Sequence, residues 1–294
     1  MERAVVLDGR ALAVKIKKSL KQELISLKQK GVIPSVVAIQ VGKDAASYVY
    51  LKQQKKSCEE IGITYELKEL PQNISEKDLL KEIEKINSDT KVTGIILQMP
   101  LPKALDARKI QIAIAPRKDI EGVHPYNMGM LVYGTSKIAP PTAEAAIELL
   151  KSSGVELKGK EVTIVGRSAI VGKPIALLLL KNKPTSPTPT ICHSVTKDMA
   201  FHTKRADILI VAVGKAHLIK GDMIKKGAIV IDVGINPAPE ALKRFGKKIV
   251  GDVDFDEAKK LASFISPVPG GVGPLTVAMF LRNIVECSKN IDKI

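Results

Sequence analysis

Apolar positions along the chain follow two alternating periods, which predict an α/β fold. From 12 to 27, leucine and isoleucine recur every three or four residues, as in a helix, and the apolar run 35–41 is typical of a buried strand. The alternation continues with an expected helix at about 47–61, a strand at 64–70, a helix with a capping-box-like start at Ser75 and a strand at 92–98. Because helices alternate with strands, we expect a parallel sheet, at whose carboxyl edge ligands gather.

A strand, a glycine-bearing turn and a helix are expected in succession over residues 162–180. Gly166 and Gly172 bracket the turn, and Pro174 fits the first turn of a helix, where its missing N–H costs nothing. Such a turn directs backbone N–H groups and the positive end of a helix to one point, which suits a phosphate. The spacing of the two glycines departs from the usual G-x-G-x-x-G, so an ordinary βα turn remains an alternative on the spacing alone.

The second half of the chain is typical of a Rossmann-type nucleotide-binding domain. The expected strand 188–194 ends at His193 and Ser194, where a Rossmann unit selects between a ribose and a 2′-phosphate. A carboxylate there would favour NAD, whereas Arg167, His193 and Ser194 offer a cation and hydrogen-bond donors, which favours NADP. Two further buried strands are expected at 206–213 and 228–233.

Candidate chemistry in the first half follows directly on the last of its expected strands. Residues 98–102, QMPLP, carry two prolines that form a stiff wall, and the polar loop 116–127 contains Asp119, Glu121 and His124. Carboxylates beside a rigid cleft can orient an amine-bearing ring or transfer protons. The alternative is that these side chains only stabilise turns.

The end of the chain combines a glycine-rich loop with a helix. Gly270, Gly271 and Gly273 allow the backbone to approach a flat ligand ring closely. Pro274 opens a helix whose apolar stripe is expected to pack on the N-terminal half of the chain.

Composition narrows the classes of function. The chain has 294 residues, enough for two domains, and 45% of them are apolar. No apolar run reaches the roughly 18 to 20 residues of a membrane span, and the start lacks the layout of a signal peptide, so we expect a cytoplasmic protein without a membrane partner. Three widely spaced cysteines argue against a disulfide framework or a zinc site, and no metal is expected.

The net charge of +15, from 46 Lys and Arg against 31 Asp and Glu, would suit a nucleic acid or a small anionic ligand. The lysines are spread along expected helices, however, and aromatic residues make up 3% of the chain, too few for a stacking platform. Solvated helix faces therefore explain the charge, and no nucleic-acid partner is expected.

A set of short segments resembles, in order and over nearly the whole chain, the motifs of the methylenetetrahydrofolate dehydrogenase/cyclohydrolase (FolD) family. The segments are VGKDAASYVYLKQQKKSCEEIGI, QMPLP, KDIEGVHPYNMG, VGRSAIVGKP, CHSVT, ADILIVAVG, VIDVGIN, GDVDF and PVPGGVGP. The resemblance implies two α/β domains, the C-terminal one a Rossmann-type doubly wound parallel sheet, with a folate cleft between them. It assigns 1–139 and a C-terminal helix at 274–294 to the folate-binding catalytic domain, and 140–273 to the NADP-binding domain.

The resemblance also implies an oxidoreductase and hydrolase of one-carbon metabolism and purine biosynthesis, which acts on tetrahydrofolate derivatives as a homodimer. Hydride passes from 5,10-methylenetetrahydrofolate to NADP⁺, and water opens the resulting methenyl cation to 10-formyltetrahydrofolate. The implied catalytic residues are Tyr50, Gln54, Gln98 and Glu121. The implied folate-binding residues are Tyr50, Gln98, Pro100, Glu121, Gly271 and Gly273, and the implied cofactor-binding residues are Gly166, Arg167, Ser168, His193, Ser194 and Ile235.

Three positions depart from the motifs that the resemblance rests on. Gln54 stands where the family has a lysine, four residues after Tyr50. Glu121 replaces an aspartate and is one methylene longer, and residues 140–145, PPTAEA, differ from the family's P-C-T-P-x-G.

The glutamine has the largest consequence for chemistry, because an amide carries neither a charge nor a mobile proton. Lys52, Lys55 and Lys56 lie about 100° to 160° around the helix from Gln54, so their side chains leave on other faces. The sequence therefore predicts an NADP-dependent dehydrogenase with weak or no cyclohydrolase activity. Two alternatives stay open: a fully bifunctional enzyme in which another group, or a water held by Gln54 and Gln98, replaces the lysine, and a folate- or nucleotide-binding paralogue without catalysis.

Overall fold

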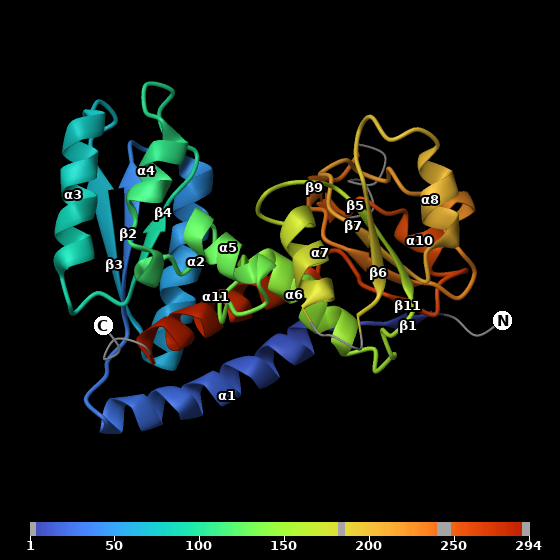
Figure 1. Cartoon of the computed structure of the whole chain (residues 1–294), viewed down its shortest axis with the longest axis horizontal. Helices are drawn as coiled ribbons and strands as arrows, with labels where there is room; N and C mark the ends of the chain where they lie inside the picture. Colours follow the sequence, from blue (N-terminus) through green and yellow to red (C-terminus); the bar gives the residue numbers. More distant parts are fainter. Residues whose placement is uncertain (1–3, 182–185, 240–247, 290–294) are drawn as a thin grey trace. The chain divides into compact units, whose positions relative to one another are not determined.

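The computed structural model describes residues 4–181, 186–239 and 248–289, except the side chains of 45–47, 49 and 50, and the chain divides into two compact units (Figure 1). The N-terminal unit comprises Lys15–Met130, Ser136–Ala139 and Phe280–Ile294. The C-terminal unit comprises Met1–Val14, Leu131–Thr135 and Pro140–Met279. Helices α1 (Gly9–Gln29) and α11 (Val272–Ser288) contribute residues to both.

The N-terminal unit is built on a three-stranded parallel sheet in the order β3-β2-β4. Its strands are β2 (Ser35–Val41), β3 (Thr64–Leu70) and β4 (Gly94–Leu97). Its further helices are α2 (Ala45–Ile61), α3 (Glu76–Ser88), α4 (Ala107–Ala113), the 3₁₀ turn η1 (Pro116–Lys118) and α5 (Pro125–Val132), which ends in the C-terminal unit. Ile83 of α3 and Ile110 of α4 pack with Ile39 of β2 in one buried cluster. Because the strands are parallel, their carboxyl ends meet at one edge of the sheet.

Local sequence signals set the bounds of two of these helices. Ser75 Oγ accepts a hydrogen bond from Asp78 N at 3.1 Å and donates one to the Asp78 carboxylate, so the predicted capping-box-like start of α3 is confirmed. Helix α2 ends before Gly62, as predicted, because the left-handed φ of 95° at this glycine closes the helix and its N–H donates to Cys58 O.

The C-terminal unit is built on a six-stranded parallel sheet in the order β1-β11-β8-β7-β5-β6. The strands are β1 (Val5–Val6), β5 (Glu161–Val165), β6 (Thr188–Cys192), β7 (Ile208–Val211), β8 (Ile229–Asp232) and β11 (Phe264–Ile265). A separate antiparallel pair joins β9 (Asn236–Pro237) to β10 (Ile249–Val250). The helices are α6 (Pro141–Lys151), α7 (Gly172–Leu180), α8 (Met199–Arg205), α10 (Phe255–Ala258) and the 3₁₀ turn η2 (Gly221–Met223).

The strand order reverses at β5, because β6 lies on one side of it and β7 on the other. A doubly wound sheet binds its ligand in the crevice at such a switch point. The predicted fold class of two α/β domains, the second with a Rossmann-type parallel sheet, is confirmed. The domain boundaries that the resemblance assigns stay a prediction.

The strands that were not predicted from the sequence are the shortest ones. β1, β9, β10 and β11 have two residues each, which is too few to show a period of two. Helices α7 and α11 begin at Gly172 and Val272, so Pro174 and Pro274 both fall in a first helical turn, as predicted.

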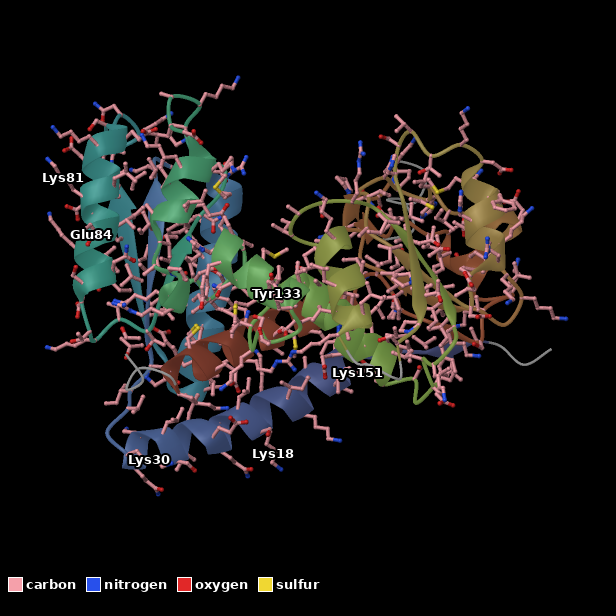
Figure 2. All side chains as sticks on the ribbon, in the orientation of Figure 1. Lys18, Lys30, Lys81, Glu84, Tyr133 and Lys151 are labelled. Atoms are coloured by element: carbon pink, nitrogen blue, oxygen red, sulfur yellow. The ribbon has the colours of Figure 1, made fainter. Side chains whose placement is uncertain are left out.

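Charged side chains project from the helices, as Lys18, Lys81, Glu84 and Lys151 show (Figure 2). This arrangement supports solvated helix faces as the explanation of the net charge. In the described parts of the chain, no helix is both long and apolar enough to cross a membrane. Nor do the described residues bring three or more His, Cys, Asp or Glu side chains together as a set of metal ligands.

Candidate functional site

The carboxyl end of β4 gathers several of the residues expected to bind folate. Gln98 follows Leu97, the last residue of the strand, and its Nε2 donates to Met99 O at 2.8 Å. The Leu97 N–H donates to the Glu121 carboxylate, which brings the loop 116–127 to the same strand end. The peptide bond between Met99 and Pro100 is cis, and Pro100 is exposed beside this strand end. Gln98, Pro100 and Glu121 therefore lie at one edge of the N-terminal sheet.

Asp119 and His124 hold the loop rather than face a ligand. The buried Asp119 carboxylate accepts hydrogen bonds from His124 N at 2.7 Å and from Asn127 Nδ2 at 2.8 Å. The Tyr126 N–H donates to His124 Nδ1, so the proton of the neutral imidazole sits on Nε2, which lies 3.1 Å from Ile112 O. For these two residues the turn-stabilising alternative therefore describes the structure.

Glu121 is the titratable group of this loop with the largest pKa shift. Burial, and next the negative charge of Asp119, raise the pKa of its carboxyl group from 4.5 to about 8, against the opposing hydrogen bond from Leu97. The next residue, Gly122, has a φ of 64°, and a Cβ there would lie 2.7 Å from the carbonyl carbon of Ala139. Asn283 Nδ2 on α11 donates to Ala139 O at 2.9 Å and to the carbonyl oxygen of Ile120, the residue before Glu121, at 3.0 Å. Helix α11 thus fixes the turn that carries Glu121.

Gln54 lies on the buried side of α2. Its side chain is 3% exposed, and its Oε1 accepts a hydrogen bond from the Tyr65 O–H of β3 at 3.3 Å. Lys52, Lys55 and Lys56 are exposed on the other side of the helix, as their angular spacing predicts. No described lysine of α2 therefore points where Gln54 points. The side chain of Tyr50, another predicted site residue, lies outside the described residues.

The turn after β5 has the close contacts that a phosphate-binding turn requires. A Cβ on Gly166, whose φ is 132°, would lie 2.2 Å from Ala212 O, and a Cβ on Gly172 would lie 1.9 Å from Gly166 O. Ser168 Oγ accepts from Val171 N at 3.1 Å and from Gly172 N at 3.4 Å, at the start of α7. Both glycines are therefore needed for the shape of the turn, which leads into the N-terminus of a nine-residue helix.

Arg167, His193 and Ser194 flank that turn. Because β5 and β6 are neighbouring parallel strands, the residues that follow each of them lie at the same sheet edge. Arg167 and Ser194 are exposed, and the half-buried His193 is held by its N–H, which donates to Thr196 Oγ1 at 2.9 Å. A cation and a hydroxyl thus stand at the point where the sequence predicts a 2′-phosphate.

The remaining predicted residues follow β8 and β11: Ile235 and Gly271 lie on loops, and Gly273 lies in the first turn of α11. Ile235 is 65% exposed at the end of β8. Gly271 packs against the first residue of α1, since a Cβ on Gly9 would lie 1.8 Å from Gly271 O. A Cβ on Gly271 itself would lie 2.7 Å from Pro267 O, so part of the glycine requirement at 271 is structural. Gly273 faces open space within 4 Å.

Sequence reasoning missed two buried carboxylates at the carboxyl edge of the C-terminal sheet, Asp232 and Asp252. Both accept hydrogen bonds from backbone N–H groups of neighbouring loops. An aspartate that directly follows an apolar strand and precedes a glycine, as in the sequence Asp232-Val233-Gly234, was the available signal.

These elements define a dinucleotide-binding α/β protein whose N-terminal sheet carries an amide and a carboxylic acid at one strand end. Residues 7–121 match the model of the tetrahydrofolate dehydrogenase/cyclohydrolase catalytic domain, and residues 140–292 match that of the tetrahydrofolate dehydrogenase/cyclohydrolase NAD(P)-binding domain. The chain belongs to the tetrahydrofolate dehydrogenase/cyclohydrolase family.

Relatives and solved structures match along nearly the full length. The chain is 48% identical over 288 residues to the bifunctional protein FolD of Nautilia profundicola, which covers 98% of both chains, and 47% identical to that of Moorella thermoacetica, which covers 97% of this chain and 99% of the relative. The crystal structure of the bifunctional FolD of Campylobacter jejuni has a TM-score of 0.92 at 43% identity, over 98% of this chain and 99% of the other. A Trypanosoma brucei FolD structure, complexed with NADP cofactor and inhibitor, has a TM-score of 0.90 at 40% identity and covers 99% of both chains.

Proposed function

We propose that this protein is an NADP-dependent 5,10-methylenetetrahydrofolate dehydrogenase of one-carbon metabolism that also acts as a methenyltetrahydrofolate cyclohydrolase. The observation that carries the proposal is the match of both family models to a chain with a glycine turn after β5 and the Gln98 and Glu121 side chains after β4. The names of the relatives at 47% and 48% identity, all bifunctional, favour the bifunctional alternative over a dehydrogenase with little or no hydrolysis.

The C-terminal unit fits a bound dinucleotide. The positive end of α7 faces the turn that would hold the pyrophosphate, and within this turn Gly172 N and Lys173 N donate to Ser168. Glycine at 166 and 172 allows the close backbone packing of the turn. Arg167 supplies a cation for the 2′-phosphate, and Ile235 lies exposed on a further strand-end loop. When bound, NADP⁺ supplies the hydride acceptor, and the residues of this chain bind and orient it.

The N-terminal unit supplies the groups that hold the folate. The Glu121 carboxylate accepts hydrogen bonds from the amino and ring N–H groups of the pterin in this proposal. The Gln98 amide lies beside the one-carbon group. Hydride transfer then depends on the alignment of two bound rings, which is a proximity effect.

Hydrolysis of the methenyl product is the weaker activity in this proposal. The three lysines near Gln54 are exposed on another side of α2, so they do not take the place of a lysine at position 54. The neutral amides of Gln54 and Gln98 are left to hold the attacking water. Because an amide orients water without accepting its proton, hydrolysis is slower than hydride transfer.

The reduction of NADP⁺ in the presence of methylenetetrahydrofolate tests the dehydrogenase assignment. Purified protein is expected to form NADPH only when the folate is present, and at the same time to form the methenyl product. If the folate causes no reduction of either NADP⁺ or NAD⁺, the result would favour a paralogue without catalysis.

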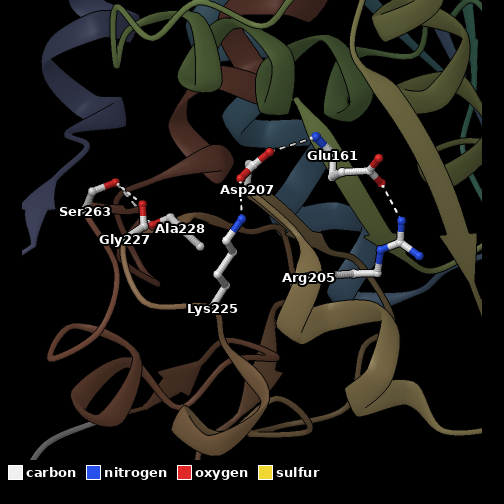
Figure 3. Close-up of polar contacts among 7 residues, drawn as sticks. All are labelled: Glu161, Arg205, Asp207, Lys225, Gly227, Ala228 and Ser263. Atoms are coloured by element: carbon white, nitrogen blue, oxygen red, sulfur yellow. Dashed lines mark hydrogen bonds and ion pairs between the residues drawn. The ribbon is translucent and has the colours of Figure 1, made fainter. Parts of the chain in front are cut away.

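An Arg167→Ala variant is expected to weaken the binding of NADP much more than that of NAD. The lost charge-assisted pair with the 2′-phosphate costs about 1.5 to 3 kcal/mol, or roughly 10- to 100-fold in Kd. Titration calorimetry with both cofactors measures the difference. Arg205→Ala is the matched control, since Arg205 is an exposed arginine that pairs with Glu161 at the opposite end of the sheet (Figure 3). Equal losses for NADP and NAD, or none, contradict the assignment.

The homodimer implied by the family resemblance has a candidate surface on the edge strand β6. β6 is one of the two edge strands of the sheet, and apolar side chains around it are exposed: Ile191 is 37%, Leu180 is 48% and Val195 is 72% exposed. An unpaired strand edge with apolar neighbours suits a second copy of the chain.

A cytoplasmic location of the protein stays a prediction.

Light scattering after size exclusion is expected to give a dimer for the natural sequence and a shift to monomer for Ile191→Lys. Val5→Lys, on β1 at the other edge of the same sheet, is the control and is expected to leave the dimer intact. A monomeric natural protein, or loss of the dimer only in the control, rules out this surface.

A further inference from the structure

One buried carboxylate connects three loops at the carboxyl edge of the C-terminal sheet. Asp252 Oδ2 accepts hydrogen bonds from Val213 N at 2.7 Å and Gly214 N at 2.9 Å, and its Oδ1 accepts from Lys215 N at 2.8 Å. Asn236 Nδ2 donates to the same Oδ1 at 2.8 Å. Asp252 itself is 0% exposed. A single side chain thus fixes three successive N–H groups of the turn after β7 and ties them to the loop after β8.

A second carboxylate holds the first in place. Asp232 Oδ1 accepts from Asp252 N at 3.0 Å and from Gly234 N at 2.9 Å, and its Oδ2 accepts from Val253 N at 2.9 Å. Backbone N–H groups compensate its charge, although burial still raises the pKa of Asp232 to about 7.

The two glycines beside these carboxylates leave no room for a side chain. A Cβ on Gly251 would lie 1.8 Å from Asp232 Oδ2, and a Cβ on Gly234 would lie 2.2 Å from the carboxyl carbon of Asp252. Gly234, Gly251 and the two aspartates therefore form one packed unit, which we call the carboxylate brace.

The topology places the carboxylate brace at one half of the proposed cofactor site. The pyrophosphate belongs to the turn after β5, and the adenosine half lies toward β6, where the 2′-phosphate is selected. The nicotinamide half consequently extends over the other side of the switch point, toward β7 and β8. The loops after these two strands are the ones that Asp252 ties together.

The carboxylate brace also directs the phosphates away from β7. Successive backbone N–H groups in a turn form an anion site. In the turn after β7 those N–H groups are already bound by Asp252, so they are not available to a phosphate.

We propose that Asp252, supported by Asp232, is a positioning residue that sets the loops after β7 and β8 against the nicotinamide half of NADP. The inference rests on the proposed function, since it concerns the cofactor of that reaction. It predicts that loss of the brace impairs hydride transfer and the binding of whole NADP, and spares the binding of the adenosine half.

An Asp252→Asn variant tests the proposal, because the amide nitrogen would turn a donor toward backbone N–H groups that need an acceptor. We expect NADP to bind about tenfold more weakly or more, or kcat to fall by that factor at saturation. The Kd of adenosine 2′,5′-bisphosphate, which resembles the adenosine half alone, is expected to change by less than about twofold. Hydrogen exchange at Val213 to Lys215 is expected to quicken in the ligand-free variant.

Asp207→Asn is the matched control at the amino end of the same sheet. Asp207 also accepts from a backbone N–H, that of Glu161 at 3.0 Å, and from Lys225 Nζ at 2.7 Å (Figure 3). This variant is expected to retain the Kd values of both ligands and kcat. If Asp252→Asn does not fold, Asn236→Ala takes its place, because it removes one of the donors to Asp252. This variant is expected to weaken NADP binding or lower kcat by a smaller factor and to retain the binding of the bisphosphate.

Three results would overturn the proposal. The first is that Asp252→Asn, or Asn236→Ala in its place, retains the Kd values and kcat as Asp207→Asn does. The second is that the Kd of adenosine 2′,5′-bisphosphate rises as much as that of NADP, and the third is that hydrogen exchange at Val213 to Lys215 is unchanged. A natural protein that binds NADP but never oxidises methylenetetrahydrofolate would refute the proposed function alone. The binding and exchange comparisons need no folate, so they still test the carboxylate brace in that case.

Discussion

Gln54→Lys is expected to raise the rate of methenyltetrahydrofolate hydrolysis by about 10² to 10⁴-fold, the usual size of general acid–base catalysis. A lysine would place a positive charge and a mobile proton where the glutamine offers only neutral hydrogen bonds. Hydride transfer depends on the alignment of two rings, so the rate of NADP⁺ reduction should change little. Stopped-flow absorbance of methenyl decay, with added methenyltetrahydrofolate as substrate, measures the hydrolytic step alone.

The surroundings of position 54 can accept the lysine by reversing one hydrogen bond. Tyr65 now donates its O–H to the Gln54 carbonyl oxygen. A lysine Nζ would instead donate to the Tyr65 oxygen, which can accept. Because position 54 is 3% exposed, the ammonium loses hydration, and the variant is expected to be less stable than the natural protein.

Gln53→Lys is the matched control, since Gln53 is the exposed neighbour on the same helix. It adds the same charge to α2 but is expected to leave hydrolysis unchanged. If the natural protein hydrolyses methenyltetrahydrofolate far faster than buffer does, and Gln54→Lys adds nothing, another group has taken over the role of the lysine.

Glu121→Gln is expected to raise the KM for the folate roughly 10- to 100-fold and to change the Kd of NADP by less than about twofold. The carboxylate can accept two hydrogen bonds from the amino and N–H groups of the pterin, whereas a glutamine amide offers one oxygen and would turn a donor toward one of them. Steady-state kinetics in folate, with NADP⁺ saturating, separates the two effects. Glu69→Gln, an exposed position near the end of β3, controls for the loss of a negative charge.

The raised pKa of Glu121 gives this prediction a pH dependence. With a pKa of about 8, the carboxyl group is mostly protonated in the free protein at pH 7, and folate binding must deprotonate it. The KM for folate should therefore fall as the pH rises toward 8, and the Gln variant should lose this dependence. A natural protein with a flat profile, or a variant with unchanged folate KM and kcat, would show that Glu121 has only a structural role.

The same shift affects stability with a definite sign. Between the ordinary pKa of 4.5 and the folded value of about 8, the folded protein binds more protons at Glu121 than the unfolded chain does. The stability that this proton contributes is present below pH 4.5 and is lost as the pH rises through 8. The unfolding free energy of Glu121→Gln, relative to the natural protein, is expected to rise over that window.

The elements that could be predicted from the sequence are those with strong local signals. The capping box at Ser75, the apolar run before Gly166 and the glycine stop at Gly62 act over a few residues, and the structure keeps them. Strands β1 and β11 could not be predicted, because two residues are too few to show a period. Their pairing joins positions 5 and 264, which only the folded chain brings together.

The candidate site was predictable in its residue types but not in its contacts. In the sequence, Asp119, Glu121 and His124 are equally good candidates on one polar loop. The structure distinguishes them, because Asp119 and His124 form hydrogen bonds that stabilise the loop, whereas Glu121 has a strongly raised pKa. The side chain of Gln54 turns toward Tyr65, which no spacing along α2 could show. The link between Asp252 and the turn at Val213 likewise spans 39 positions in the chain.

One reaction of the natural protein with methylenetetrahydrofolate and NADP⁺, in which NADPH and methenyltetrahydrofolate are followed together, tests both proposed activities. NADPH is expected to form first, and methenyltetrahydrofolate is expected to build up because hydrolysis is the slower step. It is then expected to decay faster than in buffer alone. Methenyl decay at the buffer rate would contradict the bifunctional proposal, and the absence of folate-dependent NADPH would contradict the assignment of a dehydrogenase.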